Sequence, residues 1–287
     1  MKNYIITALA VALTMTACIS NDDTYESDAS RTVSVTFNVQ GDFTLTMDPM
    51  TRALEADGKM MTDVWCLDYV GGVLQQKIHQ TNDDDDFGTP TLALGLGEHH
   101  IYFVASRGTG ATLNTEAKTL TFARVLDTFW KDYKITITAG TSSGSRWVSL
   151  DRVVTKLKVV FSDAIPTGAA TFNVTPTAWY YGFNYTTGDP TTATSSQAIT
   201  INIPAPEIGA VNEAISVFGF SSATEWATDI AINCKKSDDT VIGSASIAAA
   251  PFVRNRVSEY TGPLFGDNGS MTLSLNTDWS TSHTGTW

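Results

Sequence analysis

The sequence predicts an all-β protein built from two β-sandwich domains, with at most one or two short helices. Apolar and polar residues alternate with a period of two in several segments, as in strands that bury one face. Threonine, which suits pleated and half-buried surfaces, supplies 42 of the 287 residues. Gly, Asp and Pro separate the apolar segments at short intervals, which is typical of β-sandwiches.

Four segments alternate most clearly, and each is predicted to be a strand with one buried face. Their apolar positions are Val33, Val35, Phe37 and Val39; Ile135 and Ile137; Ile199, Ile201 and Ile203; and Met271, Leu273 and Leu275. The first and the last of these segments carry the same apolar alternation, so either could pair in a similar sheet environment.

Continuous apolar runs predict further strands that are buried on both faces. These runs cover residues 63–69, 101–105, 153–161 and 215–220. The dipeptide Gly71-Gly72 joins two apolar runs and predicts a tight hairpin. Residues 123–133 instead place apolar side chains three to four positions apart, which predicts one short helix covering a sheet.

The length of the chain allows two domains. We expect a signal peptide over 1–17, an acidic flexible tether over 18–30, an N-terminal sandwich over 31–146 and a C-terminal sandwich over 147–287. Small residues between Gly140 and Ser145 favour a boundary there, because the next long strand follows closely.

The N-terminus indicates the compartment. Lys2 precedes a short apolar segment that ends in Met15-Thr16-Ala17-Cys18, which resembles a bacterial lipobox. The resemblance implies cleavage before Cys18 and attachment of acyl chains such as palmitate, which anchor a protein to a membrane. Acidic residues after Cys18 resemble the export signal of Bacteroidota surface lipoproteins and imply the outer face of the outer membrane. An ordinary signal peptide with a chance cysteine is the alternative.

The net charge and the positions of the cysteines limit the classes of ligand and the disulfide bonds that we expect. The formal charge of −12 does not favour nucleic-acid binding, which needs a basic surface. Cys66 and Cys234 lie in separate apolar runs, so we expect two buried free thiols. A disulfide between them is the alternative outside the cytoplasm.

Catalytic patterns are weak. The segment Gly140-Thr-Ser142-Ser-Gly144 matches G-x-S-x-G, yet a nucleophile elbow needs a helix after the serine, and strand-like residues stand there instead. The four histidines lack zinc spacing, and no glycine-rich phosphate loop follows a strand. The sequence therefore predicts no enzyme, no metal site and no cofactor.

Two clusters leave alternatives open. The run Asp83–Asp86 is typical of a solvated hairpin tip, with Ca²⁺ binding as the alternative. The cluster Trp179, Tyr180 and Tyr181 is typical of a core strand. Its alternative is an aromatic platform that stacks on sugar rings, as in a glycan-binding surface lipoprotein.

Several segments together resemble the fimbrillin-type lipoproteins of Bacteroidota, the subunits and anchors of type V pili. The segments that carry this resemblance are 51–53, 61–69, 101–106, 151–156, 179–182, 254–257 and 261–262, in this order behind the lipobox. The resemblance spans about residues 31–279 and implies two transthyretin-like Greek-key sandwiches.

The resemblance also implies a function in cell adhesion at the fimbrium. In polymerising members an Arg-specific protease cuts at a position that matches Arg52-Ala53, and this removes the lipid anchor and the first strand. The strand with Val33, Val35, Phe37 and Val39 would be exchanged for a donor strand, for which we expect Met271, Leu273 and Leu275. The implied partners are other fimbrial subunits and a receptor on a host or bacterial surface.

Overall fold

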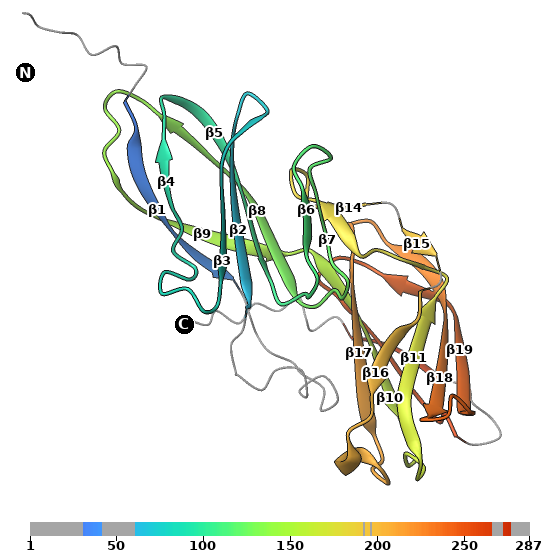
Figure 1. The fold of residues 1–287 in the computed structure, drawn as a ribbon. Coiled ribbons are helices and arrows are strands. Elements are labelled where there is room, and N and C mark those ends of the chain that lie inside the picture. The colour runs from blue at the N-terminus through green and yellow to red at the C-terminus, as the bar shows by residue number, and fades with distance from the viewer. Residues whose placement is uncertain (1–30, 42–60, 192, 196, 266–271, 277–287) are drawn as a thin grey trace, which may run out of the picture.

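The computed structural model describes residues 31–41, 61–191, 193–195, 197–265 and 272–276, and it consists of two sandwiches placed end to end (Figure 1). The structure confirms the all-β fold, since the 3₁₀ turn η2 (Ala205–Glu207) is the one helical element in these ranges. The predicted signal peptide, the tether with Cys18 and the pair Arg52-Ala53 lie outside the described residues.

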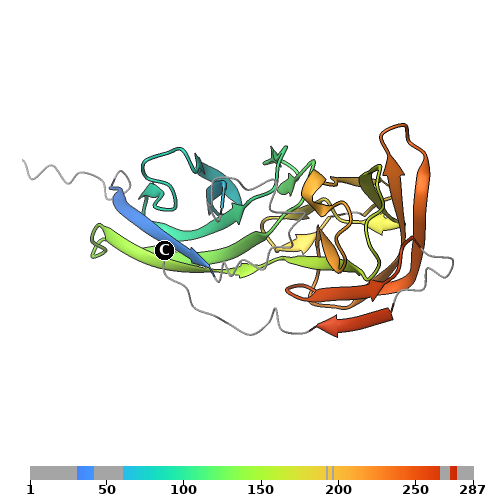
Figure 2. The ribbon, with the colours of Figure 1, turned by 90° about the horizontal axis from the view of Figure 1, so that it is seen from below.

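The first sandwich is one seven-stranded sheet with the order β3-β2-β5-β8-β9-β1-β4. The sheet curls, so that β9, β1 and β4 face β2, β5 and β8 across a common core (Figure 2). The strands are β1 (Val33–Gly41), β2 (Asp63–Val70), β3 (Val73–Thr81), β4 (Thr91–Leu94), β5 (Gly97–Ser106), β8 (Thr128–Ile137) and β9 (Gly144–Arg152).

Two sequence predictions are confirmed in this sandwich. The alternating segment with Val33, Val35, Phe37 and Val39 forms β1, and these apolar residues all lie in the core. Gly71 and Gly72 form the turn between β2 and β3, with φ angles of 56° and 81°. Positive φ at both central positions is what a tight hairpin turn demands, and glycine adopts it without steric cost.

The predicted helix over 123–133 is wrong. Strand β8 begins at Thr128 and pairs along its whole length with β5, from Ser106 opposite Thr128 to Gly97 opposite Ile137. Val125 and Leu126 lie buried in the connection before the strand. Pairing with a distant strand satisfies every second peptide group of β8, and this outweighs a weak local spacing of apolar residues.

The second sandwich has two four-stranded sheets, with the orders β17-β10-β20-β21 and β16-β11-β18-β19. Its strands are β10 (Val154–Phe161), β11 (Ala169–Pro176), β16 (Ile199–Asn202), β17 (Glu213–Phe220), β18 (Trp226–Lys236), β19 (Val241–Phe252), β20 (Val257–Gly262) and β21 (Thr272–Asn276), with a short pair β12 (Ala178–Trp179) and β15 (Thr194–Ser195). Stacked rings of Phe161 and Phe172, 4.4 Å apart, lie in its core.

The chain crosses between the sandwiches at Val153, because β9 still pairs with β1 and β10 begins one residue later. The boundary expected at residue 146 lies inside β9. Of the small residues that favoured it, 140–143 form the connection between β8 and β9, and Gly144 and Ser145 begin β9.

A third apolar cluster and a small sheet join the two sandwiches. Strands β6 (Thr112–Asn114) and β7 (Thr119–Thr121) come from the first half, and β13 (Gly182–Asn184) and β14 (Asp189–Pro190) come from the second. They form one sheet in the order β14-β13-β7-β6. Beneath it, Trp65 and Leu67 of β2 share a buried cluster with Phe183 and Phe220.

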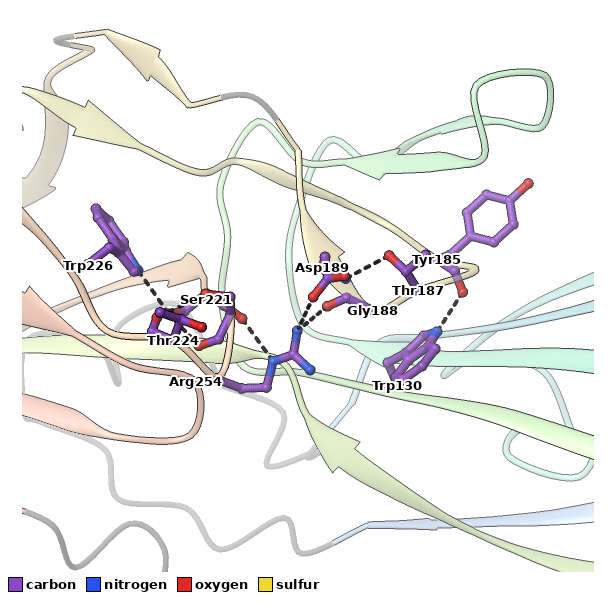
Figure 3. A network of polar contacts seen from close by, with 10 residues as sticks. Trp130, Tyr185, Thr187, Gly188, Asp189, Ser221, Thr224, Trp226 and Arg254 are labelled. Carbon is purple, nitrogen blue, oxygen red and sulfur yellow. Dashed lines mark hydrogen bonds and ion pairs between the residues drawn. The ribbon is translucent and has the colours of Figure 1, made fainter.

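Polar contacts reinforce this junction. The Trp130 indole of β8 donates to the carbonyl oxygen of Tyr185 over 2.6 Å, and Arg254 donates to the carbonyl oxygens of Gly188 and Ser221 (Figure 3). These bonds tie both sandwiches to the β13–β14 hairpin, so the molecule is one continuous structure.

Candidate functional site

Strand β1 is the structural centre of the sequence-predicted exchange site. It lies between two neighbours, pairing in parallel with β9 from Val35 to Gly41 and antiparallel with β4 from Val33 to Thr36. Beyond β4, the N–H groups of Phe37 and Val39 donate to the carbonyl oxygens of Pro90 and Gly88 over 2.9 and 3.0 Å. The backbone of β1 is thus bonded on both sides.

The side chains of β1 fill the core of the first sandwich. The exposed fractions of the four inward residues, Val33, Val35, Phe37 and Val39, are 2%, 1%, 0% and 6%. The Phe37 ring lies 5.2 Å from the Phe103 ring and 5.5 Å from the Tyr133 ring, measured between centroids. Burial of each such side chain contributes roughly 1.5–3 kcal/mol, so β1 contributes substantially to the stability of the first sandwich.

An apolar cavity of about 370 Å³ lies at the C-terminal end of β1. Val39, Met61 and Val64 line it from the interior, and Trp147 of β9 lines it at the surface, where its side chain is 66% exposed. The groove that β1 occupies therefore ends in additional apolar space.

The predicted donor segment forms strand β21 at the edge of the second sandwich. Among the described residues it pairs with β20 alone, with Leu273 opposite Tyr260 and Leu275 opposite Ser258. Met271, the third predicted donor residue, lies outside the described residues. An edge strand can leave its sheet by breaking a single ladder of hydrogen bonds.

The aromatic cluster does not form the platform that glycan stacking needs. Trp179 is 1% exposed, and its indole donates to the carbonyl oxygen of Phe218 over 2.9 Å. The Tyr180 ring meets the Trp226 ring edge-on, at 87° and 5.0 Å. Trp179 is therefore a core residue, and the flat exposed pair proposed as an alternative is wrong.

The acidic run forms a turn. The Asp84 carboxylate accepts hydrogen bonds from the backbone N–H and the hydroxyl of Thr81 over 2.6 and 3.2 Å. Within the described ranges, no three His, Cys, Asp or Glu side chains gather as they would around a metal ion. Ser142 lies in the connection between β8 and β9, as the turn interpretation predicts.

Both thiols are free and buried, as predicted. Burial raises the pKa of the Cys234 thiol to about 11, so this thiol stays protonated and unreactive at neutral pH.

The sequence did not predict one polar pair in the core, which is formed by Asp68 and His99. Asp68 and His99 are 0% and 2% exposed, and their side chains meet over 2.8 Å between Oδ1 and Nδ1. The run over residues 63–69 offered a signal, because it predicts a strand buried on both faces and Asp68 lies two residues from Cys66, on the same face.

No helix within the described ranges is both long enough and apolar enough to cross a bilayer.

Comparison with known proteins gives structural neighbours only. No family model matches the sequence, and no curated protein matches it. A candidate adhesin from Bacteroides ovatus superposes with a TM-score of 0.50 at 11% identity, over 86% of this chain and 94% of that one.

Two further structures are more distant. A fimbrial assembly protein from Parabacteroides distasonis has a TM-score of 0.46 at 10% identity, covering 85% and 95% of the two chains. The tip fimbrial protein Mfa3 from Porphyromonas gingivalis has a TM-score of 0.43 at 12% identity, covering 85% and 99%. The chain thus has the fold of the Bacteroides ovatus structure over most of both chains.

Proposed function

We propose that this protein is a lipid-anchored cell-surface subunit or anchor of a fimbria that acts in cell adhesion and assembles by β-strand exchange. The adhesins and fimbrial proteins among its structural neighbours support the coarse function. The position of β1 in the first sandwich is the single observation that carries the exchange mechanism.

Strand β1 is suited to removal because of how the chain runs. It is the first described strand, and both of its neighbours, β9 and β4, are joined to it by hydrogen bonds rather than by a turn. One cut in the segment between Gly41 and Met61 separates β1 covalently from the rest of the sandwich, and that segment contains Arg52.

A strand with the same alternation can replace β1. Four buried apolar side chains contribute very roughly 6–12 kcal/mol together, so an empty groove would favour an incoming strand strongly. The sequence of β21 offers Leu273 and Leu275 in the required alternation, at the edge of its own sheet. Main-chain hydrogen bonds to the neighbouring strands then supply affinity, and the alternate apolar side chains fix the register of the incoming strand.

An Arg-specific protease tests the processing step. Treatment of the purified full chain should release a fragment that ends at Arg52, and size analysis should show a ladder of polymers. The variant Arg52→Ala should remain monomeric, whereas Arg146→Lys, in strand β9, should polymerise like the unchanged protein. Assembled fibres that retain residues 18–52 would contradict cleavage at this bond, and a monomer after cutting would contradict the function of a shaft subunit.

A second experiment tests the donor strand. Leu275→Asp should block polymerisation after cutting, because the groove of β1 is apolar. Ser274→Asp is the matched control, since it adds the same charge one position away, on the opposite face of the strand. Equal polymerisation by both variants would overturn the assignment of residues 272–276 as donor.

Lipid anchoring has its own test. Cys18→Ser should move the protein from the outer-membrane fraction to the medium, because the acylated thiol is lost. An unchanged membrane fraction would exclude Cys18 as the anchor.

A further inference from the structure

The two end strands of the seven-stranded sheet, β3 and β4, are joined by side chains. The described residues show no ladder of backbone hydrogen bonds between these two strands. Instead, the Gln76 side chain of β3 donates from Nε2 to the carbonyl oxygen of Ala93 over 2.5 Å, and its Oε1 accepts from the Ala93 N–H over 3.4 Å. One side-chain amide thus pairs with both backbone groups of a residue in β4.

Gln80 makes the same kind of bridge to the segment that precedes β4. Its Nε2 donates to the carbonyl oxygen of Asp86 over 2.9 Å, and its Oε1 accepts from the Gly88 N–H over 3.2 Å. Gln80 is 3% exposed, so these two bonds offset the cost of burying its amide. Gln76 lies four positions earlier in the strand and therefore on the same face of β3.

The backbone of β4 uses its other side to pair with β1. The carbonyl oxygens of Gly88 and Pro90 point toward β1, where they accept hydrogen bonds from the N–H groups of Val39 and Phe37. Backbone groups along an antiparallel strand point to alternate sides, so those of Ala93, three residues after Pro90, point away from β1. The glutamine bridges therefore do not compete with β1 for the same backbone groups.

We infer that Gln76 and Gln80 are positioning residues for strand exchange: they hold β4 in place while β1 is absent, so that the groove accepts a strand instead of closing. This inference rests on the proposed function and deepens it, because it names the residues that keep the groove open.

Without β1, the groove has a direct way to close. Strand β4 runs antiparallel to β1 and β9 runs parallel to it, so β4 and β9 run antiparallel to each other and would present two unpaired edges across the gap. A shift of β4 by about 4.8 Å, one strand spacing, would let these edges pair and would exclude a donor strand. Strand β4 cannot make this shift without breaking its bonds to the glutamines.

The other contacts of β4 are less able to prevent this shift. Leu92 and Leu94 are fully buried, but apolar contacts are non-directional and do not fix the distance between two strands. The Nε2 atom of His99 donates to the carbonyl oxygen of Gly95 over 2.9 Å, which holds the chain only beyond the end of β4. The glutamine bridges act on the part of the chain that an incoming strand would meet.

Uptake of a peptide tests the inference. The full chain is cut with an Arg-specific protease, the protease is inhibited, and a fluorescent peptide with the sequence of residues 31–41 is added. The unchanged protein should take up the peptide to saturation, as followed by fluorescence anisotropy. The double variant Gln76→Met, Gln80→Met keeps the side-chain length but loses all four hydrogen bonds, so its rate of uptake should fall by about tenfold. Gln75→Met is the matched control and should behave like the unchanged protein, because Gln75 is exposed and donates to Val73 within β3.

A second variant separates hydrogen bonding from packing. In Gln76→Glu at pH 7, the carboxylate accepts from the Ala93 N–H but repels the Ala93 carbonyl oxygen, so uptake should be slower. At pH 4, below the ordinary pKa of a glutamic acid of about 4.3, the protonated group donates and accepts as the amide does. Uptake relative to the unchanged protein at the same pH should then recover, and the peptide itself has no carboxylate side chain. This variant also decides the inference if the double variant does not fold.

Three results would overturn the inference. They are equal uptake by the unchanged protein and the double variant, no recovery of Gln76→Glu at pH 4, and no uptake by the unchanged protein, since the groove would then close despite the glutamines. The ladder of polymers after cutting is a separate readout. Uptake that depends on the glutamines, without a ladder, would contradict assembly by strand exchange and leave the positioning residues established.

Discussion

The hydroxyl groups of Tyr69 and Tyr185 lie 2.6 Å apart and join the two sandwiches inside a buried aromatic cluster. Tyr69 comes from β2 of the first sandwich, and Tyr185 follows β13 of the second half. Burial, together with the hydrogen bond between Tyr185 and Tyr69, raises the pKa of Tyr185 well above its ordinary value, so the Tyr185 hydroxyl stays protonated at physiological pH. The junction is therefore a packed core, and the sandwiches should unfold together.

Removal of one of these hydroxyl groups tests this cooperativity. Tyr185→Phe should lower the free energy of unfolding by about 1–2 kcal/mol, because it leaves the Tyr69 hydroxyl buried without its partner. Urea unfolding, followed by fluorescence and by circular dichroism, should give one coincident transition for both proteins. Tyr181→Phe is the control, since its hydroxyl makes a long bond and should cost less than about 0.5 kcal/mol. Two separate transitions in the unchanged protein would contradict a shared core.

The close approach of Gly188 to Trp130 gives a second prediction. Gly188 has a φ angle of 76°, and a Cβ atom there would lie 2.8 Å from the Trp130 ring. Gly188→Ala should lower the free energy of unfolding by about 2–4 kcal/mol, because the cost of backbone strain and the cost of overpacking against Trp130 add together. Thermal unfolding measures the loss.

Gly209→Ala is a matched control for that substitution. Gly209 has a φ angle of 86°, but a Cβ atom there meets nothing within 4 Å. Gly209→Ala should lower the free energy of unfolding by only about 1–2 kcal/mol, because it introduces backbone strain without a steric clash. Equal losses for the two variants would mean that Trp130 moves aside and that the junction is loosely packed.

A buried ion pair anchors the crossing between the sandwiches. Arg152 donates to both carboxylate oxygens of Asp127 over 2.7 and 3.0 Å, and to the side-chain oxygen of Asn255 in the second sandwich over 3.0 Å. Arg152→Met should lower the free energy of unfolding by about 3–5 kcal/mol, because Asp127 loses its partner while it remains largely buried. Chemical denaturation provides the measurement.

The surface pair of Lys131 and Asp151 serves as the comparison. Their side chains are 40% and 69% exposed and meet over 2.9 Å. Lys131→Met should change stability by no more than about 1 kcal/mol, since solvent screens this pair. A similar loss in Lys131→Met and Arg152→Met would show that burial does not set the strength of the pair at the junction.

Alternation and turn chemistry predicted much of the fold. The alternation over residues 33–39 placed all four of its apolar side chains in the core, and Gly71-Gly72 predicted the first hairpin, because both signals are local. The helix over 123–133 failed because partners distant in sequence decide the structure of β8.

The candidate site could be predicted only in part. The alternation that includes Val33 and Phe37 predicted a strand with one buried face. The position of this strand between β9 and β4, however, depends on residues more than 50 positions away in the sequence. Trp179 and Tyr181 looked alike in the sequence. Trp179 packs against Trp226 and Phe252 in the core, whereas Tyr181 lines a cleft together with residues 123–126. Both sets of neighbours are distant in the sequence, so local residue types do not distinguish the two rings.

The buried Asp68 predicts a dependence of stability on pH. Burial, offset in part by the hydrogen bond and the charge of His99, raises the pKa of Asp68 above its ordinary value of 3.8. Its Oδ2 atom makes no hydrogen bond within the described residues, and the nearby Cys66 thiol, its pKa also raised by burial, supplies no charge at neutral pH. The folded protein thus holds a proton on this carboxyl group more tightly than the unfolded chain does.

The stabilisation by that proton is complete below pH 3.8 and is lost as the pH rises through the raised pKa. The free energy of unfolding of the unchanged protein, minus that of Asp68→Asn, should therefore fall with rising pH. The fall should be about 1.4 kcal/mol for each pH unit between the two pKa values. Urea unfolding between pH 3.5 and pH 7 measures this difference. A difference between the unchanged protein and Asp68→Asn that stays constant over this range would mean that His99 cancels the cost of burying the Asp68 charge.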